Sequence, residues 1–455
     1  MTRLTLLLVA VGWMVLALPA LAGTAARVSG GLHYRLKARL DPAHHGLEVE
    51  AWIRQPPASR FYLHTGLSVR QVMADGKKVA FHRDASAEPL PYAPVGAAVV
   101  VETKGCRELY VKYSGEVSDV VSGINMITPD LVELAYYSAW YPIFAGMANY
   151  TFEMEVDAPA GFLTTTNGLL KEQQEQEGRL LMTWTSYEPG FDMVLIASPR
   201  LHRLEAGVKG SRVEMYYANL PADVLQARIG SLVKGMGWLS DAYGPPRVSG
   251  VLRFVYSPRG GWGYSRIPLF VVPEAPAREE MGREHGEARD LHGGYHEMAH
   301  FWWVLADPST PDDWINEGLA EYSAFRLSQQ QAGQPFADML VQEYQLHGQA
   351  SQTSASIADT EGSSPDREIN RYEKTALMLI EAQRRFGQAP LDKVLRSLHT
   401  RFAGTLQATT ALFLEEVRVQ MGAEAEVFFR EVLFRKGEVS LPVAQPARPG
   451  SASPP

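Results

Sequence analysis

The sequence has a single cysteine, Cys106, among its 455 residues. One thiol cannot form an internal disulfide, and it excludes the cysteine-rich zinc sites of many small domains. Any metal site must therefore use histidine and carboxylate side chains. Positive charge is also scarce, because 43 Lys and Arg stand against 51 Asp and Glu and leave a net charge of −8. The basic surface of a nucleic-acid-binding protein is missing, so we expect no nucleic acid among the partners.

Long hydrophobic runs are missing after the N-terminus. Residues 4–18 form one apolar stretch behind Arg3, and Ala-Leu-Ala at 20–22 follows as a cleavage site of small residues. This order is typical of a secretory signal, and the stretch is shorter than the roughly 20 residues of a membrane span. We expect residues 1–22 to be cleaved, the protein to be exported to the periplasm or secreted, and the mature chain to have no membrane span. The alternative is that the segment stays as an anchor.

The composition is that of a globular protein, with 46% hydrophobic and 21% charged residues. From residue 32 to about 204, short β-rich runs alternate with turn signals such as Asp75-Gly76. This pattern predicts an antiparallel β domain over residues 23–205, in which the polar segment 171–178 is an exposed hairpin tip. The strands are expected at 47–53, 95–102, 108–113, 150–156, 180–185 and 193–198.

From residue 206 onward, most apolar residues recur with helical periodicity. The segment therefore predicts a mostly helical second domain over residues 206–437, with two strands at 248–256 and 267–272. The fold class is α+β with two domains. Residues 438–455 are rich in Pro, Ala and Ser, which predicts a disordered tail. The helices are expected at 221–243, 284–305, 314–331, 336–349, 369–386, 391–402 and 409–421.

The strongest chemical signal is an HExxH motif at residues 296–300. On a helix, side chains four residues apart lie on one face, about 5–6 Å from each other. Two imidazoles placed in this way can bind one Zn²⁺, while Glu297 projects beside them and can act as a general base toward water. The competing interpretation is an ordinary helix with two partly exposed histidines. His292 lies one turn earlier, and we expect that it is not a ligand.

A third ligand is expected from the segment Trp-Ile-Asn-Glu-Gly at 314–318. A proline and two aspartates before it mark a helix start, and Glu317 lies one turn in. A set of His296, His300 and Glu317 can hold one zinc ion and leaves the fourth position for water. Glu321 lies one turn further along, where it either accepts a hydrogen bond from a ligand histidine or faces solvent.

The two motifs together resemble the HExxH…WxNEG pattern of the zinc aminopeptidases typified by membrane alanyl aminopeptidase. These are gluzincins with a thermolysin-like catalytic domain. Residues 301–316 separate the second histidine from the glutamate, and this loop is two residues shorter than is usual in the family. The resemblance covers most of residues 135–435 and implies a zinc peptidase with a peptide substrate.

A later segment is similar to the YEKG sequence of the same family. It reads Tyr-Glu-Lys-Thr at 372–375, with Thr375 where the family has glycine. The family's tyrosine stabilises the oxyanion that develops on the substrate, and the resemblance gives this role to Tyr372. A phenol suits the role, because it stays protonated at neutral pH and can donate one hydrogen bond.

The chain departs from the family at its GxMEN segment, whose glutamate binds the free α-amine of the substrate. The corresponding residues 260–265 include Gly260 and Gly261, which can bring a strand close to a bound peptide, but no carboxylate. Glu274 lies too far downstream to take the place of that glutamate in the same register. The chain therefore resembles a short, divergent member of the family that lacks the amine-binding glutamate.

We therefore expect an exported zinc metallopeptidase with one Zn²⁺, which hydrolyses peptide bonds with metal-activated water and is aminopeptidase-like. Two alternatives stay open: an endopeptidase or other amide hydrolase that needs no free amine, and a non-catalytic zinc-containing binding protein. The intact Glu297 favours catalysis, because a purely structural site needs no base. The natural peptide and the oligomeric state do not follow from the sequence.

Overall fold

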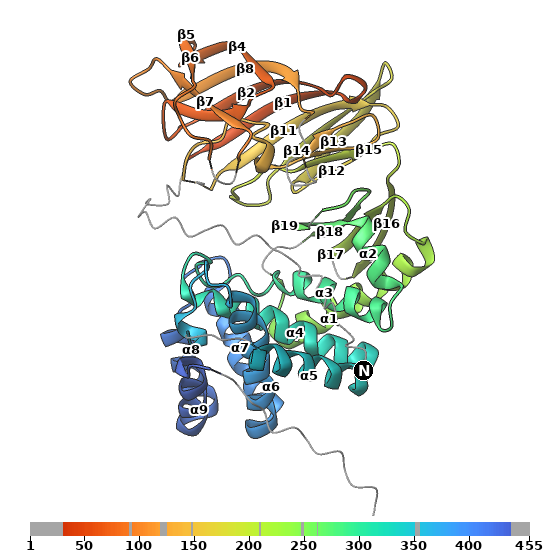
Figure 1. The fold of residues 1–455 in the computed structure, drawn as a ribbon, viewed down its shortest axis with the longest axis vertical. Coiled ribbons are helices and arrows are strands. Elements are labelled where there is room, and N and C mark those ends of the chain that lie inside the picture. Colours follow the sequence, from red (N-terminus) through yellow and green to blue (C-terminus); the bar gives the residue numbers. More distant parts are fainter. Residues whose placement is uncertain are drawn as a thin grey trace, which may run out of the picture. The chain divides into compact units, whose positions relative to one another are not determined.

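The structure is a computed structural model that describes residues 31–90, 93–118, 125–146, 149–208, 211–246, 250–261, 263–350 and 355–437. The expected signal at 1–22 and the expected tail at 438–455 lie outside these residues. The chain forms two compact units (Figure 1). The first unit takes residues up to 230 together with 250–282, and the second takes 231–249 together with 283 onward. The domain bounds expected from the sequence stay a prediction.

The largest sheet of the first unit has eight strands in the order β13-β14-β11-β1-β2-β8-β4-β5. Its neighbours are antiparallel except for β1 and β11, which run parallel. Every second residue of β1 and β2 is buried, because a strand alternates its side chains between the two faces of the sheet. The expected antiparallel β domain is confirmed, with one parallel pair added. The strands are β1 (His33–Asp41), β2 (Gly46–Arg54), β4 (Leu67–Ala74), β5 (Lys77–Lys78), β8 (Glu108–Glu116), β11 (Thr151–Pro159), β13 (Leu169–Gln176) and β14 (Arg179–Thr185).

The polar segment at 171–178 differs from its prediction. Most of it belongs to β13, an exposed edge strand, and only Glu177 and Gly178 form the tip of the hairpin with β14. Both of these residues have positive φ, which is the backbone of the tight turns that suit the twist of two paired strands. An edge strand needs few apolar side chains, and for that reason its sequence looked like a turn.

Two smaller sheets share a core with the large one. Trp140 and Trp184 are among the largest side chains of this core and are almost completely buried. One sheet has the order β12-β15-β10-β9 and the other β3-β7-β6. Their strands are β3 (Arg60–His64), β6 (Phe81–Asp84), β7 (Gly96–Val101), β9 (Met126–Ile127), β10 (Val132–Leu134), β12 (Leu163–Thr166) and β15 (Leu195–Ser198).

A five-stranded sheet completes the first unit in the order β16-β17-β18-β20-β19. Strands β17 and β18 are parallel and are joined by the long helix α1, as a parallel crossover requires. Arg253 on β18 pairs with Glu214 on β17 at 2.8 Å, and it also donates to the backbone oxygens of Thr166 and Gly168. One buried guanidinium therefore fastens this sheet to the rest of the unit. The elements are β16 (His202–Val208), β17 (Ser211–Tyr217), α1 (Ala222–Tyr243), β18 (Val251–Ser257), β19 (Tyr264–Arg266), β20 (Leu269–Pro273) and α2 (Glu274–Met281).

The second unit is helical in its described residues. Helix α4 lies at its centre, and every residue from Trp314 to Ser328 is buried. The segment 369–374 is a π-helix, η5, that runs directly into α6. The elements are α3 (Gly286–Ala299), α4 (Trp314–Ala332), α5 (Gln334–Ala350), η5 (Ile369–Lys374), α6 (Thr375–Phe386), α7 (Gln388–Phe402), α8 (Thr410–Met421) and α9 (Ala423–Phe434), with short 3-10 turns η3 (Pro311–Asp313) and η4 (Ile357–Asp359).

The helix expected at 284–305 is shorter in the structure. It ends at Ala299, and tight backbone turns follow over residues 300–303. Trp302 donates to the backbone oxygen of Gly244, whereas Trp303 donates to Ser323 on α4. Gly244 directly follows α1 and Ser323 lies on α4, so the turns at 300–303 let two adjacent rings reach two different helices.

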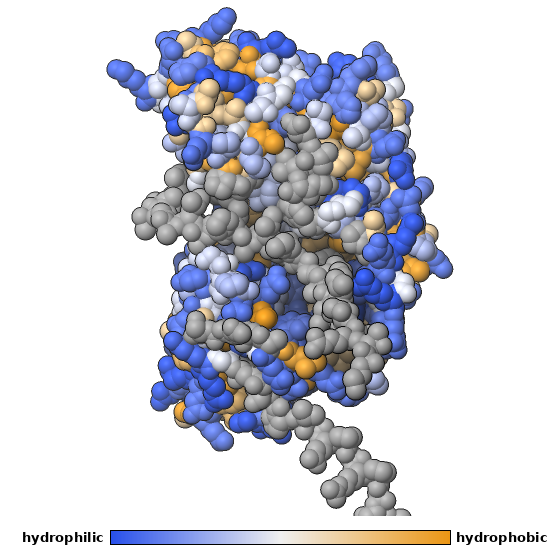
Figure 2. All heavy atoms as spheres, in the orientation of Figure 1, coloured by the Kyte–Doolittle hydropathy of each residue, from blue (hydrophilic) through white to orange (hydrophobic). Residues whose placement is uncertain are grey.

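Among the described residues, few large apolar side chains are exposed, namely Phe191, Leu346, Val419, Val427 and Phe434. The face drawn in Figure 2 is mostly hydrophilic, with hydrophobic residues scattered over it. Within the described parts of the chain, we find no helix with the length and apolar character needed to cross a bilayer.

Candidate metal centre

Helices α3 and α4 bring the three predicted ligands together. Glu317 Oε2 lies 3.5 Å from His296 Nε2 and 3.4 Å from His300 Nε2. One donor atom from each of the three residues lies within 4.8 Å of the others. Three donors around a tetrahedral zinc ion, at 2.0–2.1 Å from it, are about 3.3 Å apart. The chemistry and the spacing of this donor set therefore fit Zn²⁺.

Each histidine ring is held by its other nitrogen. His296 Nδ1 lies 2.7 Å from Glu321 Oε2, and His300 Nδ1 lies 3.2 Å from the backbone oxygen of Trp303. A hydrogen bond at Nδ1 places the hydrogen there and leaves Nε2 as the lone-pair donor. Of the two alternatives for Glu321, the structure favours the hydrogen bond to a ligand histidine.

Glu321 is itself held by two further side chains. His292 Nε2 lies 2.9 Å from Glu321 Oε1, and the hydroxyl of Tyr344 donates to the same oxygen. His292 Nδ1 in turn contacts Ser328 Oγ at 2.9 Å. His292 therefore lies behind the metal centre, as expected for a residue that is not a ligand. Burial alone would raise the pKa of Glu321, but the charge and hydrogen bonds of His292 and His296 hold it well below its usual range.

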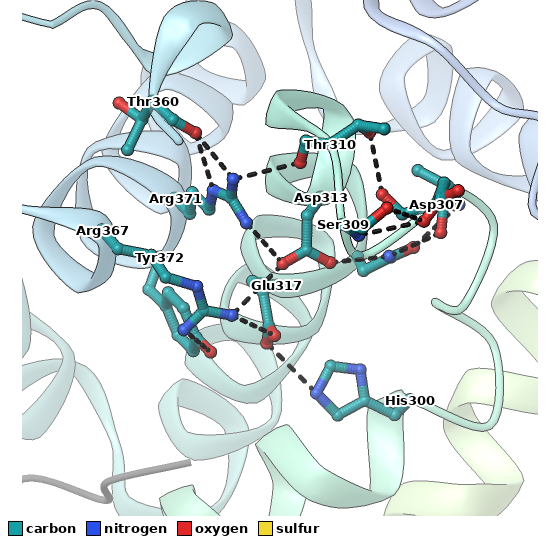
Figure 3. A network of polar contacts seen from close by, with 12 residues as sticks. His300, Asp307, Ser309, Thr310, Asp313, Glu317, Thr360, Arg367, Arg371 and Tyr372 are labelled. Atoms are coloured by element: carbon teal, nitrogen blue, oxygen red, sulfur yellow. Dashed lines mark hydrogen bonds and ion pairs between the residues drawn. The ribbon is translucent and has the colours of Figure 1, made fainter. Parts of the chain in front are cut away.

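The second oxygen of Glu317 faces a cluster of arginines (Figure 3). Arg367 Nη2 donates to Glu317 Oε1 at 3.1 Å and to Asp313 Oδ2 at 3.2 Å. Arg371 pairs with the same Asp313 oxygen at 2.7 Å and donates to the backbone oxygen of Thr360 at 2.6 Å. These contacts leave Glu317 Oε2 as the oxygen that faces the histidines.

Tyr372 reaches the site from the π-helix η5. Its ring stacks on the His296 ring, with centroids 5.3 Å apart and planes 7° from parallel. Arg367 Nη1 donates to its hydroxyl oxygen at 3.2 Å. A π-helix turn is wider than an α-helix turn and is frequent at functional sites. Burial is the main reason that the pKa of Tyr372 lies well above its usual value, so the phenol keeps its hydrogen at neutral pH.

Glu297 lies on α3 directly after His296, three residues before His300, which follows the end of the helix, and is buried. Burial raises its pKa, although His296 and His300 act in the opposite direction. For His296, burial would lower the pKa, but hydrogen bonds to Glu317 and Glu321 outweigh it and raise the pKa to about 10. The carboxylates therefore make this cluster strongly attractive to positive charge.

The loop between α3 and α4 is held by one residue of the Trp-Ile-Asn-Glu-Gly segment. Asn316 Oδ1 accepts hydrogen bonds from the backbone nitrogens of Leu305 and Ala306, at 2.8 and 3.0 Å. Its Nδ2 donates to Asp313 Oδ1 at 2.9 Å. The asparagine before the ligand glutamate thus fixes the loop that leads into α4.

The predicted substrate-binding glycines belong to the first unit, between β18 and β19. Gly261 has a φ of +81°, a conformation that favours glycine, whereas a side chain at Gly260 would meet nothing within 4 Å. Their role in substrate binding stays a prediction. Glu274 has another partner, because its Oε1 accepts hydrogen bonds from the backbone nitrogens of residues 218–220.

Sequence reasoning missed the arginines and Tyr344. Arg367 and Arg371 lie four residues apart just before Tyr372, so a helix there presents two cations on one face. This spacing was the available signal for the arginines. Tyr344 on α5 lies far from the motifs in sequence, and nothing in its surroundings marks it.

Comparison with known proteins gives a likeness of fold. No protein-family model matches the sequence, and no curated protein sequence matches it. An M1 zinc metallopeptidase from Deinococcus radiodurans has a TM-score of 0.65 at 22% identity, over 92% of this chain and 96% of that one. A glutamate-to-alanine variant of an M1 zinc metallopeptidase from the same organism, with a bound Tyr-Ser-Ala substrate, also gives 0.65 at 22% identity, over 91% and 96%. A two-domain M1 zinc metallopeptidase variant bound to L-arginine gives 0.65 at 22%, over 90% and 96%. The chain shares the two-domain fold of these M1 zinc metallopeptidases, with β sheets followed by a helical domain.

Proposed function

We propose that this protein is a zinc metallopeptidase that holds one Zn²⁺ with His296, His300 and Glu317. The observation that carries the proposal is the convergence of three donors, of which His296 and Glu317 are buried and His300 is partly buried, and whose other atoms are each held by a partner. When bound, Zn²⁺ supplies a Lewis acid that polarises the scissile carbonyl and makes water more acidic. The fold that the chain shares with zinc metallopeptidases supports the same function.

Two further side chains supply the proton transfer and the oxyanion contact. Glu297 takes the proton of the attacking water and passes it to the leaving amine, a role that its burial beside the two histidines supports. Tyr372 donates its hydroxyl hydrogen to the carbonyl oxygen as negative charge develops there. A non-catalytic zinc protein would have no use for either group at these positions.

Aminopeptidase-like specificity rests on the resemblance and on the short peptide and amino acids bound by the structural neighbours. A second candidate, a hydrolase with no need for a free amine, is favoured by a specific observation. Residues 257–266 contain no carboxylate, and two buried carboxylates pair with arginines of this segment, Glu133 with Arg259 at 2.6 Å and Asp192 with Arg266 at 2.7 Å. A carboxylate held in this way is a poor anchor for the amine of a substrate.

A digest of a peptide library by the purified mature chain tests the proposal. We expect cleavage that a chelator stops and added Zn²⁺ restores. The variant Glu297→Gln should bind one zinc ion per chain but should lose cleavage, because an amide cannot take the proton. Metal-independent cleavage, or wild-type turnover by Glu297→Gln, contradicts the mechanism.

Paired free and N-acetylated peptides separate the two specificities. An aminopeptidase cleaves only the free peptides and removes single residues from their N-terminal ends. The second candidate cleaves both members of each pair at similar rates.

We also propose that the protein is exported, which the apolar run and the cleavage site at residues 1–22 support. Expression of the full chain followed by fractionation and N-terminal sequencing tests this. A mature protein outside the cytoplasm that begins near Gly23 is the expected result, and a full-length chain in the cytoplasm contradicts it.

A further inference from the structure

Arg367 is a buried cation that lies just before η5 and is only 8% exposed. It donates to both of the groups that the proposed reaction needs from this side of the site. Its Nη2 contacts Glu317 Oε1 at 3.1 Å, and its Nη1 contacts the hydroxyl oxygen of Tyr372 at 3.2 Å (Figure 3). Its guanidinium carbon also lies 5.4 Å from the centroid of the Tyr372 ring. One side chain therefore touches a proposed ligand and the proposed oxyanion donor.

The contact with Tyr372 has a fixed direction. Arginine has only hydrogen-bond donors, so the phenol oxygen must be the acceptor. The hydroxyl hydrogen of Tyr372 must then point away from Arg367. A hydroxyl that accepts a hydrogen bond from a cation is also polarised and becomes a stronger donor. Arg367 therefore turns that hydrogen away from itself and toward Glu317, with which the hydroxyl also interacts, and the oxygen of a substrate competes for it there.

The contact with Glu317 divides the two oxygens of the carboxylate. Oε1 is taken by Arg367, and Oε2 faces His296 and His300. A cation on one oxygen favours coordination through the other oxygen alone. The same guanidinium thus sets the orientation of both Glu317 and Tyr372.

A purely structural role does not explain these contacts. Asp313 already pairs with Arg371, which also holds the backbone oxygens of Thr310 and Thr360. The packing of η5 against the start of α4 is therefore served by Arg371. Arg367 also contacts Asp313, at 3.2 Å, but what it adds to Arg371 is its pair of contacts with Glu317 and Tyr372.

We propose that Arg367 is a positioning residue that aims Tyr372 at the developing oxyanion and holds Glu317 with its Oε2 toward His296 and His300. This proposal rests on the proposed peptidase function. Arg367 makes its contribution through Tyr372, so the loss of either residue should remove the same interaction.

A double-mutant cycle tests the coupling between the two residues. The variants are Arg367→Met, Tyr372→Phe and their combination, and kcat and KM are measured on a peptide that the wild-type protein cleaves. We expect Arg367→Met to lower kcat about tenfold with little change in KM, since the lost contact acts in the transition state. The kcat of the double variant should lie within about twofold of the kcat of Tyr372→Phe, because the effects of two residues that act through the same contact do not add.

Arg326→Met is the matched control. Arg326 is also a buried arginine of the second unit, but it pairs with Asp392 at 2.7 Å and makes none of the contacts at the site. Its loss should lower the melting temperature and leave the kcat of the zinc-loaded protein unchanged. If Arg367→Met fails to fold, Arg367→Lys enters the cycle in its place, because a lysine keeps the charge but cannot span both partners.

Two bound peptide analogues give a readout that does not depend on activity. A phosphinic peptide carries oxygens where the oxyanion forms, and a reduced-amide analogue of the same peptide has no oxygen at that position. By calorimetry, Arg367→Met should weaken the binding of the phosphinic peptide about tenfold and leave that of the reduced amide nearly unchanged. Zinc content should stay at one ion per chain.

Three results overturn the proposal: an unchanged kcat in Arg367→Met, losses that multiply in the double variant, or equal losses for both analogues. A wild-type protein that cleaves no peptide is a different failure. In that case the proposed function falls, while the two analogues still report whether Arg367 contributes to the binding of an oxygen at the position of the oxyanion.

Discussion

Glu321 shows how a residue that touches no substrate can still control the chemistry of a site. It connects the ring of His296 to His292 and Tyr344, and all of these groups are buried or nearly so. A histidine ligand whose other nitrogen is bound to a carboxylate is more basic and is held in one orientation. The affinity for zinc should therefore depend on Glu321 almost as strongly as on a ligand.

The variant Glu321→Gln tests this dependence. We expect the affinity of the apoprotein for Zn²⁺ to fall by about 10- to 100-fold, because the amide lacks the negative charge that supports His296. Competition with a fluorescent chelator measures it. Glu343→Gln is the control, since Glu343 pairs with Arg289 away from the donors. An affinity within about twofold of the wild type would show that the charge of Glu321 does not matter.

Glu214 is a buried carboxylate of the first unit whose charge, like that of Glu321, is held by its neighbours. It is almost fully buried and receives contacts from Arg253, Arg203 and Arg212. Burial alone would raise its pKa, but these guanidinium groups outweigh burial and hold the pKa below its usual value of 4.5. A depressed pKa means that the ionised group stabilises the fold at any pH above its unfolded value. That stability is lost as the pH falls through the folded pKa.

Glu214→Gln should therefore be pH-dependent in its effect. At pH 7 we expect the free energy of unfolding to fall by about 3–5 kcal/mol, because Arg253 keeps its two backbone oxygens but is left buried without a carboxylate partner. The difference from the wild type should shrink as the pH drops below the unfolded pKa of Glu214. Urea unfolding across this pH range measures both. Glu205→Gln is the control, because Glu205 is exposed beside Arg203, and it should lower the free energy of unfolding by less than about 1 kcal/mol. If Glu214→Gln destabilises the protein equally at every pH, the charge of Glu214 is not the cause.

At the level of elements, the close approach of α4 and η5 positions the site. A side chain at Gly318 would lie 2.1 Å from Thr375 Cγ2 and 2.8 Å from the backbone oxygen of Arg371. Gly318 directly follows the ligand Glu317, and Thr375 lies three residues after Tyr372. The absence of a side chain at Gly318 thus allows the ligand and the tyrosine to approach the same point.

Gly318→Ala should push these two elements apart. We expect a loss of about 1–3 kcal/mol in stability, since an added methyl group must displace backbone atoms here. Glu317 should shift with α4, so zinc affinity should fall as well. Thermal melting and zinc titration measure the two effects. Adding Thr375→Gly should restore part of both, and no recovery in the double variant would show that the threonine is not the obstacle.

Most elements of the second unit could be predicted from the sequence, because their apolar residues recur at helical spacing. The helices expected at 314–331 and 409–421 agree closely with α4 and α8. The expected helix at 369–386 is helical throughout, but its first six residues form a π-helix, which periodicity cannot distinguish from an α-helix.

Other parts could not be predicted, for identifiable reasons. Strands β16 and β17 carry charged residues on alternate positions near a sheet edge and look like loop sequence. The three ligands follow from motifs, as do Glu297 and Tyr372, and the structure brings the ligands together and stacks Tyr372 on His296. The contact of Arg367 with Glu317 and that of Tyr344 with Glu321 arise from packing between segments far apart in the sequence. The spacing of Arg367 and Arg371 indicates two cations on one helix face, but it does not say which groups they contact.

At the scale of the whole molecule, the metal centre and the residues that hold it lie within the second unit. A ligand that binds only the folded state stabilises it, by about 4 kcal/mol at a thousandfold excess over its dissociation constant. That stabilisation should be greatest where the donors and their partners lie, in α3, α4 and η5.

Removal of zinc should therefore act locally on hydrogen exchange. We expect faster exchange of backbone amides in α3, α4 and η5 after chelation, and little change in the strands of the eight-stranded sheet. Mass spectrometry of peptic fragments, with and without zinc, measures this. Equal deprotection of β1 and β2 would show that the metal stabilises the entire chain instead.

Helix α1 is shared between the units, with the change at Ser231, and the chain returns to the first unit for residues 250–282. During translation, the later half of α1, which belongs to the second unit, is therefore made before β18 and β20, which complete the first unit. Its own packing partner, α3, is made later still, since Gly235 lies against Tyr295 and Met298. The later half of α1 therefore has no α3 to pack against until about 50 more residues have been translated. A gene cut once anywhere between codons 231 and 282 would leave both products with an open core.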